Sequence, residues 1–405
     1  MIDRFIFRQG FLALVCVLSA TAASAVDQTF DQVLNSAIKS HPLVLSKRAE
    51  VDAAQANLEG AEWGRYPTPT FESASGNNAQ SVLRIDQPLW TGGRITGLIE
   101  ASEHRLTAAD VAVEETQLDI SLRVITAYTE ALKQKARLQH ARDNFTEHKA
   151  LMEKIIRRVE QGVSSLSDRK LAQSRLLGAE SDVSVAEQAY ESALTRLTQL
   201  ANQEVTDVDQ FGLPEQLALG TLRELQDQAT DYAPTVRRLK MEIEAASSDI
   251  KVNRSAYMPE LKLRYEHTET SDLTDDSVMV VFEAQPGAGL SSVSAVKAAM
   301  ATRDSLEKAK LSAEREVKET VSTDYLEWRA SSLRTDSTAA ASVVSREVFE
   351  SYSRLYVTGH KSWLELLNAI RELAQSRYTY EETKHQAMAA RLRLLARSGQ
   401  LIPKL

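Results

Sequence analysis

The seven histidines are the residues best suited to acid–base or metal chemistry, because imidazole titrates near neutral pH and binds metals. They lie at 41, 104, 140, 148, 267, 360 and 385, and their spacing forms neither a His-Glu-x-x-His zinc motif nor another ligand pattern. The stretch "GAGLSS" at 287–292 lacks the third glycine of a dinucleotide loop, and no GxxxxGK[ST] phosphate loop occurs. We therefore predict no catalytic, cofactor-binding or metal-binding residues and no enzyme, so that any energy must come from a partner.

A second group of polar residues consists of charged side chains that alternate with apolar ones. In a strand every second residue shares a face, so these stretches predict strands with one charged and one apolar face. We expect strand pairs at about 69–87 and 260–285. A soluble hairpin packed on a helix would alternate in the same way. The charged residues are Arg84 and Asp86 in the first pair, and Lys262, Arg264 and Glu266 in the second.

Two glycines, Gly162 and Gly359, interrupt long helical patterns at positions 197 residues apart. Glycine supplies the permissive backbone that a helix end requires. Each glycine is followed by the Ser-x-x-acid spacing of a capping box, with Asp a weaker fit than Glu. These residues are Ser165 and Asp168 after the first glycine, and Ser362 and Glu365 after the second. Each turn predicts a helical hairpin, whether or not it binds a partner.

The elements that position these residues are arranged as an internal duplication. Prolines at 42, 67 and 88 recur at 234, 259 and 286, with offsets of 192, 192 and 198. Each copy predicts a helix, two short strands and a long proline-free hairpin of coiled-coil character. The first copy spans 26–210, with a helix at 28–62 and a hairpin at 98–202. The second spans 220–402, with a helix at 220–255 and a hairpin at 290–398. Residues 211–219 would link the copies, and 403–405 would form a tail.

Residues 1–25 are predicted to be a secretory signal peptide. Arg4 and Arg8 precede an apolar run at 11–20, and "ASA" at 23–25 fits a cleavage site. The apolar run is shorter than the roughly 20 residues that a membrane-spanning helix needs. Cys16, the only cysteine, lies in this segment. The exported chain would therefore contain no disulfide and no thiolate metal site.

The charge of the chain argues against nucleic acid as a partner. The net charge is −8 and becomes about −9 without the leader, which carries +1, and no basic block is present. No later segment contains the roughly 18 consecutive apolar residues of a transmembrane helix.

Export, alternating strands and aromatic residues together favour a membrane barrel over a soluble rod. Trp63 and Tyr66 precede the first strand, Trp90 follows the second and Tyr257 precedes the third, as in an interfacial girdle. Four strands cannot close a barrel, because open edges are not tolerated in lipid and small barrels start at about eight strands. The chain must therefore oligomerise, and three copies would supply twelve strands.

Together these features resemble the TolC family of outer-membrane channel proteins, over residues 28–402. The duplicated plan, the Tyr66-Pro67 entry into a strand, the motif "QPLWTGGR" at 87–94 and the glycine turns carry the resemblance. It implies a mainly α fold with a small β part. Four strands per protomer would form a twelve-stranded transmembrane β-barrel in a homotrimer, continued by a long α-helical barrel. It also implies the outer membrane of a Gram-negative bacterium, with the tunnel reaching across the periplasm.

The resemblance gives roles to the residues described above. The turns would form periplasmic tips that meet an adaptor protein, through Arg158, Gly162, Ser165, Asp168, Gly359, Ser362 and Glu365. Arg158 lacks a counterpart, because Leu355 occupies the equivalent position. The charged strand residues would face the lumen and keep the pore wet. Proline cannot donate to a strand ladder, so Pro88 and Pro286 would end pairing. Glycines would then let the chain turn from barrel to tunnel, namely Gly92, Gly93, Gly287 and Gly289.

The exported substrate stays open between alternatives. The motif "QPGAGLSS" at 285–292 departs from the commoner QP-x-x-x-GG form and is similar to the branch that serves type I secretion of large adhesins, the agglutination proteins. Its partner would be an inner-membrane ABC transporter. The runner-up is multidrug or small-molecule efflux with a resistance-nodulation-division pump. A soluble periplasmic coiled-coil structural or adaptor protein is the alternative of a different class, because helices alone do not exclude it.

Overall fold

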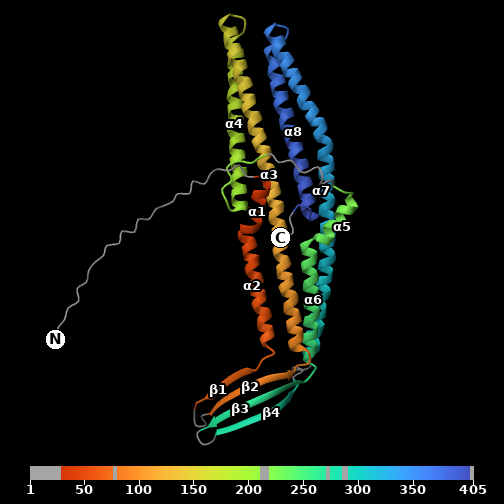
Figure 1. Cartoon of the computed structure of the whole chain (residues 1–405). Coiled ribbons are helices and arrows are strands. Elements are labelled where there is room, and N and C mark those ends of the chain that lie inside the picture. Colours follow the sequence, from red (N-terminus) through yellow and green to blue (C-terminus); the bar gives the residue numbers. More distant parts are fainter. Residues whose placement is uncertain (1–28, 76–79, 210–218, 271–273, 285–290, 402–405) are drawn as a thin grey trace, which may run out of the picture.

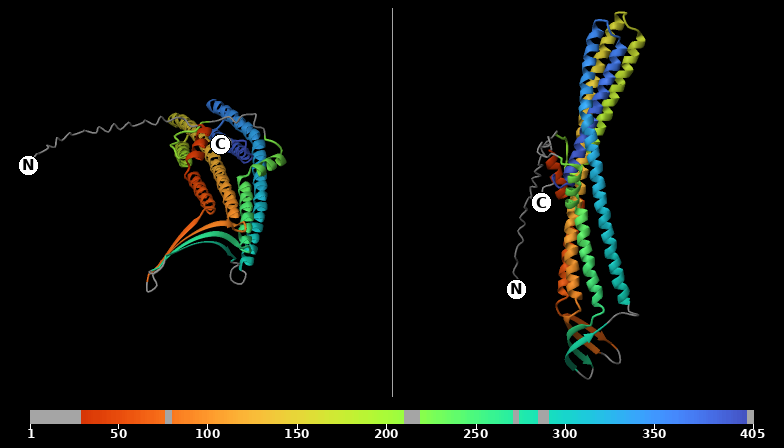
Figure 2. Two further views of the ribbon diagram at one scale, coloured as in Figure 1. Left: turned by 60° about the horizontal axis from the view of Figure 1, so that its bottom comes forward. Right: turned by 90° about the vertical axis from the view of Figure 1, so that its right-hand side faces the viewer.

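The computed structural model describes residues 29–75, 80–209, 219–270, 274–284 and 291–401. The chain forms an elongated molecule with a four-stranded sheet at one end and long helices that run away from it (Figure 1). Two helical turns lie at the opposite end. Figure 2 shows that the sheet is strongly curved and that the helices run nearly side by side. The predicted leader at 1–25 and the tail at 403–405 lie outside the described residues.

Each copy of the duplication contributes two short helices, two strands and two longer helices. The first copy comprises α1 (Phe30–Ser40), α2 (Pro42–Trp63), β1 (Thr68–Ala74), β2 (Gln80–Trp90), α3 (Arg94–Glu160) and α4 (Leu166–Ala201). The second comprises α5 (Leu222–Tyr232), α6 (Pro234–Ser255), β3 (Glu260–Thr270), β4 (Thr274–Glu283), α7 (Ser291–Val357) and α8 (Trp363–Arg397). The predicted fold class is confirmed, because the chain is mainly helical with a small sheet and is built twice.

The two arms of each hairpin differ in length. Helices α3 and α7 each contain 67 residues, or about 100 Å at 1.5 Å per residue, whereas α4 and α8 contain 36 and 35. The return arms therefore cover only the half of the long helices that is distant from the sheet (Figure 1). Near the sheet, α2 and α6 take their place against α3, and α6 also packs on α7. The helices thus form a single layer of four: α2, α3, α6 and α7 near the sheet, and α4, α3, α8 and α7 near the turns.

The short helices correct one prediction, which had a single helix at 28–62 and another at 220–255. Each region is split in two immediately before a proline, and Pro42 and Pro234 open the second helix. His41 and Ala233 precede them with non-helical ψ angles of 132° and 110°. The ring of a proline disfavours helical backbone in the preceding residue but suits the first helical turn. These prolines therefore start helices that sequence periodicity alone had merged.

The four strands form one antiparallel sheet in the order β1-β2-β3-β4, so the two copies pair directly through β2 and β3. The prediction that Pro88 ends pairing is wrong. Strand β2 continues along β3 to Trp90, with a register shift between Pro88 and Trp90. Strand β1 begins at Thr68, opposite Asp86, so the segment around Pro88 has a partner strand on one side only. An irregular, single-sided segment tolerates the donor that proline lacks.

The apolar core is divided along the length of the molecule. The largest cluster lies at mid-height, where α1 and α4 pack on α3, and it includes Phe30 and Tyr128, whose ring centroids are 5.4 Å apart. A second cluster joins the two hairpins near their turns and includes Ile155, Tyr356 and Ile370. Smaller clusters lie between α7 and the α5–α6 region. Buried apolar side chains therefore hold the two copies together both at the middle of the molecule and near the turns.

The outermost helices of the layer are covered on one side only. Helix α2 buries a single residue completely, Val44, and α7 exposes a series of apolar side chains that includes Leu326, Leu333 and Val344. Such one-sided helices are typical of a layer whose edges meet other helices. None of the described helices is long and apolar enough to cross a membrane.

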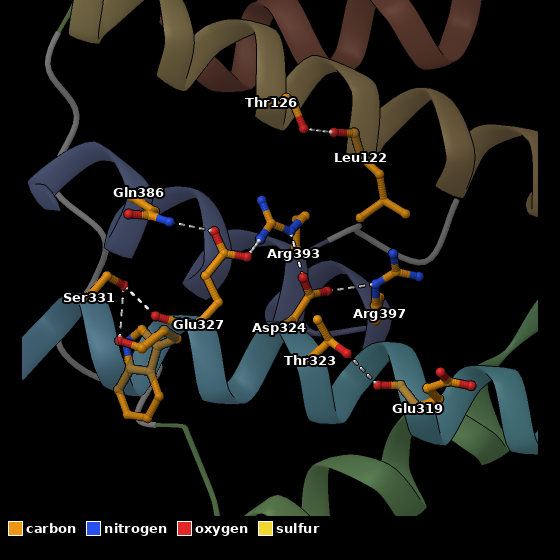
Figure 3. A network of polar contacts seen from close by, with 11 residues as sticks. Leu122, Thr126, Glu319, Thr323, Asp324, Glu327, Ser331, Gln386, Arg393 and Arg397 are labelled. Carbon is orange, nitrogen blue, oxygen red and sulfur yellow. Dashed lines mark hydrogen bonds and ion pairs between the residues drawn. The ribbon is translucent and has the colours of Figure 1, made fainter. Parts of the chain in front are cut away.

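A buried ion-pair network fastens α7 to the end of α8 (Figure 3). Asp324 of α7 is only 6% exposed. Its carboxylate accepts hydrogen bonds from Nε of Arg393 at 2.8 Å and from Nε of Arg397 at 3.0 Å. Arg393 also donates to Glu327 at 2.7 Å. Helix α8 ends at Arg397, so this network lies at the height where α7 parts from α8.

Candidate functional site

The five charged strand residues predicted from the sequence come together on one face of the sheet. The β2–β3 register sets Arg84 opposite Glu266 and Asp86 opposite Arg264. Nε of Arg84 lies 3.0 Å from Glu266, and Arg264 binds both carboxylate oxygens of Asp86 at 2.6 and 2.7 Å. Lys262 lies 3.4 Å from Asp86. Pairs of opposite charge directly across strands stabilise a sheet, so these residues form a ladder across the two copies.

Two acidic residues that the sequence analysis did not assign extend this ladder to the outer strands. Glu283 of β4 lies 2.8 Å from Nζ of Lys262, and Glu72 of β1 lies 3.8 Å from Arg84. Glu283 follows an alternating run and could have been assigned by extending that run by one residue. Glu72 lies in the weakly patterned stretch "PTFESAS", where no signal singles it out. The ion pairs therefore reach all four strands, and Met279 and Val281 of β4 lie on the same face.

The opposite face of the sheet is apolar and exposed. Phe71 of β1 and Phe282 of β4 are 70% and 71% exposed, and Val280 is also exposed. Leu83, Ile85, Leu261 and Leu263 share this face by the strand registers. Nearer the β3–β4 connection the face becomes polar, and Tyr265 donates to Asp276 at 2.8 Å. The sheet therefore has one apolar side and one ion-paired side, and no described helix packs on either.

Large aromatic side chains lie where the sheet meets the helices. The rings of Trp63 and Tyr66 are 5.2 Å apart, and both are exposed at the end of α2. Trp90 at the end of β2 and Tyr257 after α6 are exposed as well. Indole and phenol combine an apolar ring with a polar group, which suits the boundary between an apolar and an aqueous phase.

The connection from β2 to α3 depends on two glycines. Gly92 and Gly93 have φ values of 59° and 90°, in the left-handed region that favours glycine. A Cβ on Gly92 would also lie 2.6 Å from Cβ of Met258. Arg94 then begins α3 and donates to Glu260 at 2.6 Å, which ties this connection to the start of β3. The corresponding residues of the second copy, Pro286, Gly287 and Gly289, lie outside the described residues.

The two helical turns have the same backbone geometry. Gly162 and Gly359 adopt φ values of 73° and 78°. The N–H of Val163 donates to the carbonyl of Arg158, as that of His360 does to the carbonyl of Leu355. These bonds close the preceding helix in a Schellman-type ending. The predicted capping boxes at Ser165/Asp168 and Ser362/Glu365 are both present.

Charge stabilises both capping boxes. The backbone N–H of Ser165 donates to Asp168 at 3.0 Å, and this bond, with others from the Ser165 hydroxyl and Trp363, lowers the pKa of Asp168. Lys361 donates to Glu365 at 2.6 Å, and with the N–H and hydroxyl of Ser362 it lowers the pKa of Glu365 to about 2. Both carboxylates are therefore ionised at neutral pH and satisfy helix N-termini.

The turns contain two cation–aromatic contacts that the sequence analysis did not identify, and the first of them joins the two copies. The guanidinium of Arg158 lies 5.2 Å from the ring centroid of buried Tyr356, which belongs to the other copy. Lys361 lies 4.4 Å from the ring of Tyr352. Tyrosine in a helix is more often a core residue than a cation partner, so no local signal identified them. Apolar side chains remain exposed at this end, namely Val163, Leu166, Val357 and Leu364.

The titratable cluster at the α3–α8 contact was not predicted either. Glu381 is buried, and one of its oxygens lies 3.5 Å from Nε2 of His140. His385 is also buried, and its Nδ1 donates to the carbonyl of Glu381 at 2.8 Å. Burial lowers the pKa of His385, which leaves it neutral at neutral pH. Within the described residues, no group of three or more His, Cys, Asp or Glu side chains is arranged to hold a metal ion.

Comparison with known sequences places this geometry in context. The family model described as "Outer membrane efflux protein" matches residues 33–203 and 225–400. The chain is 26% identical over 214 residues to outer membrane efflux protein BepC of Brucella suis biovar 1, covering 48% of this chain and 45% of that protein. It is 23% identical over 265 residues to the nickel-cobalt-cadmium resistance protein NccC of Alcaligenes xylosoxydans xylosoxydans, covering 62% and 59%. The chain thus spans about half the length of these curated relatives.

Solved structures extend the likeness to nearly the whole chain. The outer-membrane channel OprN gives a TM-score of 0.80 at 18% identity, covering 92% of this chain and 90% of that one. CusC gives 0.78 at 15% identity, covering 92% of both. The outer membrane protein VceC of Vibrio cholerae gives 0.77 at 14% identity, covering 91% and 96%. At these identities the likeness concerns the fold.

Proposed function

The chain belongs to the outer membrane efflux protein family, and from that premise we propose that three copies form a channel-tunnel that serves as the exit duct of a tripartite export system. Family membership places it in the outer membrane of a Gram-negative cell, extending into the periplasm, and gives it no enzymatic role. It also favours the channel over a soluble coiled-coil rod or adaptor.

The two-faced sheet is the observation that carries this proposal. An apolar face with exposed Phe71, Val280 and Phe282 suits contact with lipid, and the opposite ion-paired face suits contact with water. Strands β1 and β4 are the edges of the sheet. Edges cannot remain unpaired in lipid, so β4 of one copy would pair with β1 of the next. Three copies close a ring of twelve strands.

The helical layer supports the same closure. Its outermost helices are α2 and α4 on one side and α7 on the other, and α7 exposes Leu326, Leu333 and Val344. In a ring, α7 of one copy would pack on α2 and α4 of the next and bury these side chains. The lumen would continue from the barrel into a helical tunnel, with Arg84, Asp86, Lys262, Arg264 and Glu266 on the barrel wall.

The ion-paired wall suits a passive conduit. Each guanidinium or ammonium in the ladder has a carboxylate within 4 Å, so the wall binds water without strongly attracting one sign of charge. The chain lacks a nucleotide-binding motif, so an inner-membrane transporter would supply the energy. The turns around Gly162 and Gly359 would meet the periplasmic adaptor, supported by their shared geometry and by the exposed apolar side chains beside them.

For the cargo we propose type I secretion of a large adhesin, supported by the "QPGAGLSS" motif at 285–292. Efflux of small molecules through a resistance-nodulation-division pump is the second candidate. It is supported by the names of the relatives, an efflux protein and a nickel-cobalt-cadmium resistance protein. A deletion strain separates the two. Loss of a surface adhesin with unchanged metal and drug tolerance supports secretion, whereas loss of tolerance with normal surface adhesin supports efflux.

The channel proposal is tested by fractionating cells and measuring the mass of the detergent-extracted protein. We expect a trimer in the outer-membrane fraction that conducts ions in planar bilayers. A monomer in the soluble periplasmic fraction would overturn the proposal.

The tip assignment is tested with Gly162→Glu and Gly359→Glu. Both replace a positive-φ glycine with a bulky charge on open surface. We expect intact trimers that no longer export. Gly162→Ala and Gly359→Ala, which introduce the same backbone strain without the charge, are the matched controls and should export normally. Normal export by both tip variants would refute adaptor docking at these turns.

A further inference from the structure

A groove with a polar floor lies between α4 and α8, in the half of the molecule that is distant from the sheet. Its cavity is about 270 Å³, smaller than the roughly 300–1,000 Å³ of sites for drug-sized ligands. Asn144 and His148 of α3 lie at its floor, and residues of α4 and α8 form its walls. The size admits a small molecule of about one ring.

The floor contains a buried acceptor without a partner. Asn144 is 7% exposed, and its side-chain carbonyl oxygen makes no hydrogen bond to the described residues. Leaving a buried acceptor unpaired is costly, so such groups are rare unless something else satisfies them. His148 is 9% exposed, and burial lowers its pKa, aided by Arg175 and opposed by Asp182. The floor is therefore uncharged at neutral pH and offers an acceptor to a donor from outside.

The buried polar floor belongs to the first copy. With the offset of 197 residues between the copies, Ala341 and Ser345 of α7 occupy the positions of Asn144 and His148. Ala341 is exposed and Ser345 is half-buried, so these positions of the second copy form no buried counterpart of the floor.

Gly178 of α4 lines the groove. A Cβ at this position would meet nothing within 4 Å, so no neighbour demands a glycine there. Glycine costs about 1 kcal/mol relative to alanine in a helix interior. Its counterpart in the second copy is Gln375, which lies in the opposite wall of the same groove. Position 178 therefore lines the groove without a side chain that could narrow it.

The rim of the groove is positively charged. Arg175 of α4 and Arg371 of α8 line it, with one carboxylate, Asp182. Arg371 donates to the neutral side chain of Asn368 at 2.8 Å. With His148 neutral, the charged groups of the lining sum to one positive charge. The apolar parts of the walls come from Ala179, Leu367 and Ala374.

We propose that this groove binds a small organic anion that also carries a hydroxyl or amino group. Its carboxylate would lie between Arg175 and Arg371, its donor would reach the carbonyl oxygen of Asn144, and its apolar body would contact the alanines and the leucine. Arginine suits carboxylates because its planar fork can donate two hydrogen bonds.

Calorimetric titration of the detergent-solubilised full-length trimer tests the proposal. The probes are the three hydroxybenzoate isomers and benzoate, which lacks the donor. We expect saturable binding of at least one isomer in the micromolar to millimolar range. Benzoate should bind about three- to tenfold more weakly, because the loss of one hydrogen bond reduces affinity by about this factor.

Variants then locate the site. Gly178→Leu places a side chain in the open groove and should abolish binding, while Gly60→Leu, at another open helical glycine, should leave it unchanged. Arg371→Gln should weaken binding about tenfold, and Arg329→Gln, an exposed arginine elsewhere, should not. Absence of saturable binding by every isomer, or binding that Gly178→Leu does not alter, would overturn the proposal.

Discussion

Replacement of Asp324 by asparagine should loosen the end of α8 from α7 without unfolding the rest of the molecule. The Asp324 side chain is 8% exposed and is hydrogen-bonded to both Arg393 and Arg397, whose side chains are 18% and 27% exposed. Asparagine keeps the size of the side chain but removes its charge. Two guanidinium groups would then remain partly buried beside a neutral amide.

The magnitude follows from these contacts. Breaking a buried ion pair by removing one partner costs about 3–5 kcal/mol. Arg393 retains Glu327 at 2.7 Å and Arg397 reaches solvent, so the cost falls at the lower end, about 3 kcal/mol. With about 1.4 kcal/mol for each factor of ten, local opening should become roughly 100-fold more frequent.

Hydrogen exchange followed by mass spectrometry on the purified trimer measures this opening. Amides at 386–397 should exchange about 100-fold faster in Asp324→Asn, with little change at 120–132 in the core of the first copy. Asp336→Asn, on the exposed side of α7, is the matched control and should change stability by less than about 0.5 kcal/mol. Exchange at 386–397 within threefold of wild type would refute the view that this network fastens the two helices.

Three further predictions concern the sheet, the β2–α3 connection and the turns. Val280→Arg puts a charge on the apolar face and should cost about 2–4 kcal/mol in the membrane, lowering the yield of outer-membrane trimer. Ser277→Arg, opposite Glu266 on the ion-paired face, should insert normally, and equal losses would refute the assignment of faces. Gly92→Ala should lower the melting temperature, because φ is positive and Cβ would contact Met258, whereas Gly60→Ala should raise or preserve it, and the reverse order would contradict this account. Finally, the pKa of Glu365 is lowered from 4.5 to about 2, so its stabilisation of the second turn is complete above pH 4.5 and is lost as pH falls toward about 2. Proteolysis of that turn should therefore accelerate with acid in the wild type but not in Glu365→Gln, and identical pH profiles would exclude this role.

Features that depend on neighbouring residues in the sequence could be predicted. Gly162 and Gly359 with their Ser-x-x-acid successors specify a turn and a cap within a few residues, and both are present. Alternation likewise assigned Arg84, Lys262 and Arg264 to one kind of face. The sheet then added what alternation cannot supply, which is the register that pairs Arg84 with Glu266, 182 residues away.

Features that depend on how distant helices meet could not be predicted. Asn144 and Asp324 each lie within long stretches of helix-forming residues, where an isolated polar residue normally faces solvent. Their burial follows from the positions of α4 and α8, which no local pattern encodes. Pro42 and Pro234 were misread for a different reason. Helical periodicity continues on both sides of each proline, so the pattern hid a break that the proline itself signals.

The duplication preserved the outline of the fold and changed its interior. Across the offset of 197 residues, Val321 and Tyr325 correspond to Val124 and Tyr128, whereas Asp324 corresponds to Ala127. Both copies have an apolar cluster at this level, but where the first has buried Ala127 the second adds the ion pairs of Asp324. An apolar contact is non-directional and tolerates small shifts of one helix along another. A buried carboxylate, in contrast, is stable only where its arginines are in place. The second hairpin therefore has fewer acceptable positions for α8 against α7 than the first has for α4 against α3. The double variant Ala127→Asp and Asp324→Ala should destabilise both the α3–α4 contact and the α7–α8 contact. The carboxylate introduced at position 127 would lie in an apolar cluster, and the alanine at position 324 would leave two arginines without their carboxylate.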